Sequence, residues 1–585
     1  MRIQVAICLW LVPTVTLAQQ TQPPPGYPPQ QQPYQQYPQP QYQYGYPPPQ
    51  QQYPYQYPPE QQQYQYGYPP PQGYPPPPPQ QPPQGYPPPA TGEPQAPYGA
   101  QPVKLQRLQL ATASEAAATA TWACADAIDH HRLELARQKC GEALAKDDSI
   151  AFAHLLLAQA QAPDLARNEL KRAAELAKRA SPGEHYFIEA WRALTEGRVA
   201  DARRLNDQLV NTLPGEPRAF IARGKFRHFG LGDLDAAVID FRKAAEIDPK
   251  FAAAYGYLAF ALAERRQLEE ATVAARKYVE LAPNEPDAQV TLARMALRRG
   301  EPAEAVAAAK KAVASDDKFP LGHQTLGDAL LFAGRGKEAR KEYGVLIGTD
   351  DPAVHHDGAM REARAWVFEA RLGEAEKALV SESDTAQKTK RPGDEADALV
   401  ELARLQLDRG ALTDAGNTLR QVTELLSNKE LALGMNDEER RRMSSEALGV
   451  RAMVLAAIGE RQLAEQRADD MGIALKASSD PRSADKTTAL KGWIAARNRD
   501  DKTALVDLAV ATRPTLRMAL ALAAARAGEH PRARTIMEEL AKRCENDLEG
   551  ALTRPRAAAW LKTQKPEKTE KAERAEKAEK PAPAP

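Results

Sequence analysis

The residues best suited to catalysis or metal binding are two adjacent histidine pairs, His130–His131 and His355–His356. The second pair is followed by Asp357. Histidine and aspartate bind metal ions, and histidine also serves as a general acid or base near neutral pH. Adjacent residues of a helix point about 100° apart, so the two histidines of one pair do not face a single metal ion. The spacing therefore favours exposed polar residues near helix ends over a metal site.

Other catalytic patterns are missing from the sequence. It contains no GxxxxGK[ST] phosphate loop, no GxSxG and no HExxH. Acidic pairs such as Glu269–Glu270 have the pattern of solvated helix faces, and the basic run Arg440–Arg442 directly follows acidic residues 437–439. With 77 basic and 77 acidic residues, no net field draws the chain to nucleic acid. We therefore expect a protein that is not an enzyme and has no cofactor, metal or nucleic-acid partner.

The beginning of the chain has the composition of an export signal. Arg2 precedes an apolar run that ends at Leu17, and the small residues Thr16 and Ala18 precede a polar stretch. This pattern predicts a secretory signal peptide over residues 1–18, cleaved after Ala18. No later segment is long and apolar enough to span a membrane. We therefore expect export to the periplasm or the outer cell surface, with no integral membrane span after cleavage.

Two further segments lack the composition of a folded domain. Residues 1–100 hold 30 of the 50 prolines and 15 of the 20 tyrosines. Residues 19–102 are therefore predicted to be a disordered Pro/Gln/Tyr-rich leader, because proline removes backbone donors and no aliphatic core is present. Its two interpretations are a sticky surface tether and a spacer. Residues 564–585 alternate in charge and end in Pro and Ala, which predicts a disordered, solubilising tail; the alternative is a tail that binds a partner.

The segment between leader and tail contains a repeat that would position any functional residue. Four marks recur: a small residue, Ala twelve residues later, a small or apolar residue seven further, and Pro or Asp five further. One such set is Ala259, Ala271, Tyr278 and Pro283, and the small residues Ala259, Ala293 and Gly327 lie 34 residues apart. Small side chains let two antiparallel helices approach closely, and a glycine turn separates them. The unit with Gly224 and Ala237 has one extra residue in its turn.

These marks resemble the tetratricopeptide repeat family, most clearly in the segment FAAAYGYLAFALAERRQLEEATVAARKYVELAPNEP. The resemblance implies an all-α, right-handed superhelical solenoid of about eleven helix-turn-helix repeats, flanked by the leader and the tail. The regular array is expected over 103–353, an irregular helical unit or hinge over 354–392, and a second array over 393–563. The last helix of that array, around Pro555, is expected to cap the stack.

The resemblance also indicates where a partner would bind. In this family the first helices of successive units line a groove that takes an extended or helical peptide. The Lys/Asn pattern with which some members hold a C-terminal carboxylate is absent. The positions implied to face the groove are Phe187, Trp191, Ile221, Lys225, Phe260, Arg294, Gln324, Asp328 and Phe332.

Three cysteines follow the signal peptide: Cys124, Cys140 and Cys544. Cys124 occupies the position of the small residue in the first unit, and Ala136 on the next helix is expected to face Cys124. Cys140 lies one helical turn beyond Ala136. This geometry and an oxidising compartment predict a Cys124–Cys140 disulfide, with Cys544 left as a thiol. The alternative is that Cys124 and Cys140 are buried thiols chosen for their small volume.

Together these features predict a non-catalytic interaction scaffold of the cell envelope that binds a protein or peptide in its groove. The alternative is a structural or adhesive surface protein whose leader is the working part, with the repeats as a spacer or an oligomerisation module.

Overall fold

A computed structural model describes residues 104–564, apart from residues 162, 429, 434, 436 and 478–481. Within these residues the chain is helical and contains no strand. The predicted signal peptide and leader, and all but the first residue of the predicted tail, lie outside the described residues.

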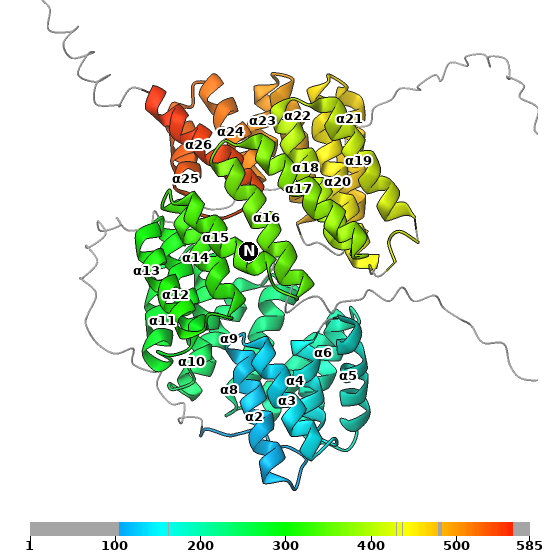
Figure 1. The fold of residues 1–585 in the computed structure, drawn as a ribbon, viewed down its shortest axis with the longest axis vertical. Coiled ribbons are helices and arrows are strands. Elements are labelled where there is room, and N and C mark those ends of the chain that lie inside the picture. Colours follow the sequence, from blue (N-terminus) through cyan, green and yellow to red (C-terminus); the bar gives the residue numbers. More distant parts are fainter. Residues whose placement is uncertain are drawn as a thin grey trace, which may run out of the picture. The chain divides into compact units, whose positions relative to one another are not determined.

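The helices follow one another in pairs joined by short turns (Figure 1). The first fourteen are α2 (Glu115–Asp129), α3 (Leu133–Lys146), α4 (Ala151–Ala160), α5 (Pro163–Leu176), α6 (Pro182–Thr195), α7 (Val199–Thr212), α8 (Pro217–Lys225), α9 (Leu234–Ile247), α10 (Ala252–Glu264), α11 (Leu268–Leu281), α12 (Pro286–Arg299), α13 (Pro302–Ser315), α14 (Pro320–Phe332) and α15 (Gly336–Ile347). The remaining eleven are α16 (Pro352–Phe368), α17 (Leu372–Lys388), α18 (Pro392–Arg409), α19 (Leu412–Ser427), α20 (Asp437–Ala457), α21 (Arg461–Ala477), α22 (Ser483–Arg497), α23 (Asp501–Asp507), α24 (Pro514–Arg526), α25 (His530–Lys542) and α26 (Leu548–Thr563).

Each helix packs on the next, and most first helices also contact the first helix of the following pair, as α10 contacts α12 and α12 contacts α14. This is a helical repeat solenoid, the predicted fold class. Stacking is needed because the apolar stripe of one pair cannot be buried within that pair. Helices α16 to α22 have 15 to 21 residues. Their length explains why the 34-residue spacing is lost in this part of the sequence.

The small residues of the repeat let aromatic rings of the second helix come close to the first. An added Cβ at Gly224 would lie 2.5 Å from Phe241 Cε1, and one at Gly256 would lie 2.8 Å from Tyr278 Cε1. Both distances are shorter than real contacts allow, so these positions exclude a side chain. The turn glycines have left-handed backbone conformations, with φ of 78° at Gly300, which closes α12.

The extra residue in the unit of Gly224 is accommodated as a π-helical turn, η1 (Phe226–Gly230), that continues α8. A π turn widens a helix by one residue and often occurs at functional sites. Here it turns Phe226 and Phe229 toward the cavities described below.

Cys124 and Cys140 form a disulfide between α2 and α3, with their Cα atoms 5.3 Å apart. Cys544 is a buried free thiol. The α2–α3 hairpin is also attached at its turn, because the Arg132 guanidinium lies 3.0 Å from the Asp316 carboxylate beyond α13.

Helix α26 does more than cap the end of the stack. It packs on α24 and α25, as expected of a last helix, but it also contacts α16 and α18. Arg556 pairs with Asp408 of α18 at 2.6 Å, and the helix runs without a break through Pro555. The prediction of a purely terminal cap was therefore incomplete, since α26 joins elements almost 150 residues apart in the sequence.

Candidate partner-binding groove

Two adjoining cavities lie on the first helices of the solenoid, and together they are called the groove here. Cavity 1 has a volume of about 90 Å³ and is bounded by α2, α4, α6, α7, α8 and η1. Cavity 2 has a volume of about 50 Å³ and is bounded mainly by η1, α10, α11 and α12. Asp129 and Phe229 line both cavities, which places the two side by side.

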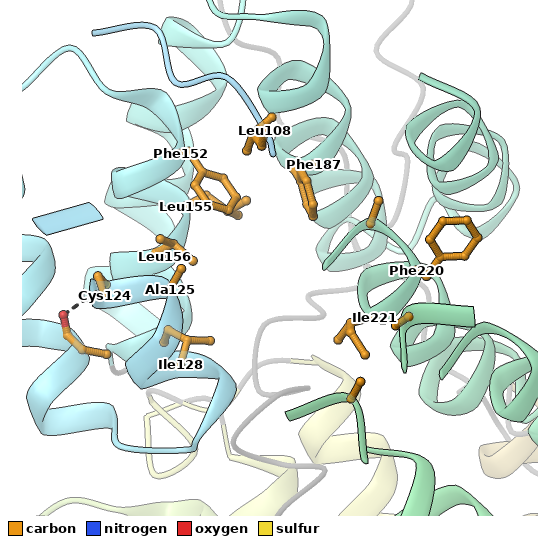
Figure 2. Packing of buried hydrophobic residues seen from close by; sticks show 14 of the residues in the cluster. Leu108, Cys124, Ala125, Ile128, Phe152, Leu155, Leu156, Phe187, Phe220 and Ile221 are labelled. Carbon is orange, nitrogen blue, oxygen red and sulfur yellow. Dashed lines mark hydrogen bonds between the residues drawn. The ribbon is translucent and has the colours of Figure 1, made fainter. Parts of the chain in front are cut away.

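Cavity 1 is mainly apolar. Figure 2 shows Phe152 of α4 and Phe187 of α6 side by side, with Ile128 and Ile221 facing the same space from α2 and α8. The ring centroids of Phe152 and Phe187 are 5.3 Å apart. Trp191, Phe226 and Phe229 complete the aromatic lining. An apolar side chain of a partner would find aromatic contacts on several sides here.

Trp191 adds a polar group to this apolar cavity. Its ring lines cavity 1, and its buried Nε1–H has no hydrogen-bond acceptor among the described residues. A buried donor without an acceptor costs free energy, and buried tryptophans usually find one. The indole N–H is therefore suited to donate to a carbonyl oxygen of a bound chain.

Cavity 2 is more polar. Phe260 and Tyr257 contribute rings, and Asp287 and Arg294 contribute charges. Asp287 accepts a hydrogen bond from the Tyr278 hydroxyl at 3.0 Å and lies 3.3 Å from His131 Nδ1. Burial alone would raise the pKa of Asp287, but the neighbouring histidines outweigh it and lower this pKa.

The first histidine pair contacts Tyr278 and Asp287, two of the residues that line cavity 2. His130 Nδ1 lies 2.6 Å from the Tyr278 hydroxyl, and His131 contacts Asp287 as described. Both histidines are half-buried, so the expectation of simple exposed residues was wrong. They attach the end of α2 to α11 and α12, because the solenoid brings its first helix pair against the fifth and sixth pairs.

The second histidine pair is also buried in a polar contact. His355 Nε2 and His356 Nδ1 lie 3.5 Å and 2.7 Å from the same carboxylate, Glu382 of α17. His356 is only 9% exposed, so its predicted exposure was wrong too. A long acidic side chain from the next helix reaches both rings although they diverge on α16. Nowhere in the described residues do three or more His, Cys, Asp or Glu side chains form a group that could hold a metal.

Six of the nine predicted groove residues line the two cavities: Phe187, Trp191, Ile221 and Lys225 line cavity 1, and Phe260 and Arg294 line cavity 2. They come from alternate helices, α6 to α12, as the repeat register requires.

The other three predicted groove residues, all on α14, lie outside the cavities. Asn546 donates to Asp328 Oδ1 at 2.9 Å, and the Arg554 guanidinium lies 5.0 Å from the Phe332 ring centroid. Gln324 is buried and donates to Asp357 at 2.6 Å. The expected open groove at α14 is therefore covered by the C-terminal part of the chain itself, which the repeat register gave no means of foreseeing.

Sequence reasoning also missed the segment before α2, whose backbone N–H groups donate to the side chains of Glu184 and Glu216. Leu108 N–H donates to Glu216 at 2.8 Å, Ala111 N–H donates to Glu184 at 2.9 Å, and the Leu108 side chain is buried. Figure 2 shows Leu108 beside Phe187. The capping pattern from Ser181 to Glu184 was visible in the sequence. That the Glu184 carboxylate also accepts a hydrogen bond from the Ala111 N–H was not.

Paired helices with a lined groove define a helical repeat scaffold. Residues 220–251, which span α8, η1 and α9, match the model of the tetratricopeptide repeat family. One unit of the array thus matches the tetratricopeptide repeat, and helical repeat arrays of this kind present extended surfaces suited to binding other proteins.

Solved structures with a similar fold include a tetratricopeptide repeat protein from Parabacteroides merdae (13% identity, 46% of this chain and 99% of that one, TM-score 0.33). Others are a thermophilic repeat protein of Thermus thermophilus (20% identity, 30% and 97%, TM-score 0.27) and MamA of Desulfovibrio magneticus (22% identity, 28% and 93%, TM-score 0.25). Likeness at these scores does not extend to what this chain binds. A comparison with curated proteins finds no match. None of the described helices is long and apolar enough to cross a membrane.

Proposed function

We propose that this protein is a non-catalytic scaffold of the cell envelope that holds a segment of a partner protein in the groove. The partner inserts an apolar side chain into cavity 1, and a backbone carbonyl next to that side chain accepts a hydrogen bond from Trp191. The segment then continues over η1 to cavity 2.

The observation that carries this proposal is the Trp191 indole in cavity 1. Its N–H is buried without an acceptor, whereas most of the surrounding lining is aromatic or aliphatic. Desolvated aromatic pockets with one directed polar group are typical of binding hot spots. Placement of the indole on α6, between α4 and α8, means that the stack of pairs and no single pair forms the site.

Export is proposed on separate grounds. The signal-like pattern that ends at Ala18 supports it, and so does the Cys124–Cys140 disulfide, since such bonds persist in oxidising compartments. The alternative function, in which the leader is the working part, rests on residues outside the described part of the chain.

A direct test is selection of binders from a library of displayed short peptides against the full mature chain. Selected peptides should share an apolar residue, and Trp191→Phe should weaken them about tenfold, because the ring remains while the hydrogen bond is lost. Trp560→Phe on α26 is the matched control, since this tryptophan lines neither cavity. Equal affinity of the wild type and Trp191→Phe for every selected peptide would contradict the proposed function.

A further inference from the structure

Arg294 is a half-buried cation whose charge is not matched by a carboxylate. Among the described residues it forms no ion pair, and its guanidinium donates to the neutral amide oxygen of Gln324 at 2.8 Å. Burial lowers its pKa to about 10, because the surrounding protein replaces water without supplying an adjacent negative charge.

Three other arginines show what matching looks like in this protein. Arg361 lies 2.6 Å from Asp328 and 2.7 Å from Asp357. Arg364 lies 3.0 Å from Glu401, and Arg513 lies 2.6 Å from Glu549. For each of the three arginines, burial would lower the pKa, but the paired carboxylates outweigh it and raise the pKa above its ordinary value. Arg294 differs from these three in both its partner and the direction of its shift.

The acidic residues that line cavity 2 are already engaged elsewhere. Asp129 is 2.8 Å from Arg218 Nε, and Asp287 contacts the Tyr278 hydroxyl and His131. Neither forms an ion pair with Arg294, although the charge of Asp287 acts on it at longer range. The cavity therefore has a cation on one wall with no carboxylate in contact with it.

The amide that contacts Arg294 is fixed in its orientation. Gln324 Nε2 donates to Asp357, whose Oδ2 also accepts from Arg361 Nε at 2.7 Å. This leaves the Gln324 oxygen directed at Arg294. Asp357 on α16 thus orients Gln324 on α14, and Gln324 in turn positions the Arg294 guanidinium on α12. None of these contacts pairs Arg294 with a negative charge.

A second cation lies on the side of cavity 1. Lys225 lines that cavity, and its Nζ lies 5.3 Å from the ring centroid of Tyr257, which lines cavity 2. The groove consequently combines an apolar cavity with a neighbouring cavity that holds an arginine without a carboxylate in contact, and the complement of this combination is an apolar residue followed by an acidic one.

We propose that cavity 2 is a carboxylate subsite, in which Arg294 binds an acidic group of the partner segment whose apolar side chain fills cavity 1. This rests on the proposed function, which it deepens by naming the chemistry of the partner. An arginine fork can hold a carboxylate through two hydrogen bonds, and desolvation inside the groove strengthens that contact.

The test uses C-terminally amidated peptides selected by display against the full mature chain. We expect an Asp or Glu at a constant distance from the apolar residue. Replacing that acid by its amide, and Arg294→Gln in the protein, should each weaken binding about tenfold or more. The two changes together should weaken it no further than either alone. Arg276→Gln on α11 is the matched control, because Arg276 is 64% exposed and lines neither cavity.

A second variant keeps the test valid if Arg294→Gln reduces helical content. Arg294→Lys retains the charge and should retain part of the affinity, and wild-type affinity for the acidic peptide should fall as salt is added. Free-acid peptides separate the two sources of a carboxylate: if the free C terminus replaces the acidic residue, the subsite binds a terminal carboxylate.

The opposite results are equally clear. Selected peptides that need Trp191 but carry no acidic group, or an amide substitution that costs the same in wild type and Arg294→Gln, would overturn the carboxylate subsite and leave the proposed function standing. Peptides indifferent to both Trp191 and Arg294 would overturn both.

Discussion

The close contact between Gly327 and the ring of Tyr343 gives the sharpest stability prediction, for Gly327→Ala on α14. An added Cβ would overlap the ring, lying 2.8 Å from Cδ1 and 2.9 Å from Cζ. The ring has little freedom to move away, because Tyr343 is fully buried and its hydroxyl contacts Asp328 and Asn546 at 2.9 Å and 3.0 Å.

Two opposing terms set the magnitude of this effect. Alanine is about 1 kcal/mol better than glycine within a helix. Overpacking in a well-packed core costs about 1–3 kcal/mol, and the anchored ring places Gly327→Ala at the upper end. The expected net loss is about 2 kcal/mol in the free energy of unfolding. Gly344→Ala on α15 is the matched control, since an added Cβ there meets nothing within 4 Å and should stabilise by up to about 1 kcal/mol.

Hydrogen exchange of the α14 and α15 amides measures both variants locally, which suits a repeat array whose unfolding need not be two-state. Exchange should be faster than in the wild type for Gly327→Ala and slower for Gly344→Ala. An unchanged or slower rate in Gly327→Ala would refute the explanation that the small residue is required by the aromatic ring.

Two further predictions concern α2–α3 and α16. The Cys124–Cys140 disulfide links residues 16 apart in the sequence, and reducing it should lower the local stability of α2–α3 by about 3 kcal/mol. Alkylation of the denatured mature chain without reductant should label Cys544 alone. Three labelled cysteines would contradict the disulfide. Burial alone would lower the pKa of His356, but hydrogen bonds to Asp397 and Glu382 outweigh it and raise the pKa to about 10. The charged ring therefore adds stability that is complete below the unfolded-state pKa of about 6.5 and is lost between there and about pH 10. In urea titrations at several pH values, His356→Gln should flatten this decline of stability with pH. An equally steep decline in the variant would contradict the raised pKa of His356.

The sequence predicted the local packing well, because helix pairing depends on residues close together in the chain. Small residues such as Gly224 and Gly327 mark where aromatic rings cross, and their spacing alone located the hairpins. The six cavity-lining residues followed from the same register, since first helices recur on one side of the stack.

What the sequence did not predict depends on contacts between distant segments. Nothing in a repeat register indicates that Asn546 reaches Asp328, 218 residues earlier, or that His131 reaches Asp287. The histidine pairs were misinterpreted for the same reason, because their partners come from other helices. The extra residue before Ala237 was visible in the sequence, but its conversion into the π turn that carries Phe229 required the structure.

We expect a partner segment to accept a hydrogen bond from the Trp191 indole in cavity 1. This hydrogen bond is tested most directly by the indole ¹H–¹⁵N resonances of the full mature chain labelled at tryptophan, with Trp191 assigned through Trp191→Phe. Adding a selected peptide should move the Trp191 resonance downfield and slow its exchange with water, as expected for a newly formed N–H···O=C bond, while the resonance of Trp560 stays in place. Binding of the peptide with no change at Trp191 would contradict the proposed hydrogen bond.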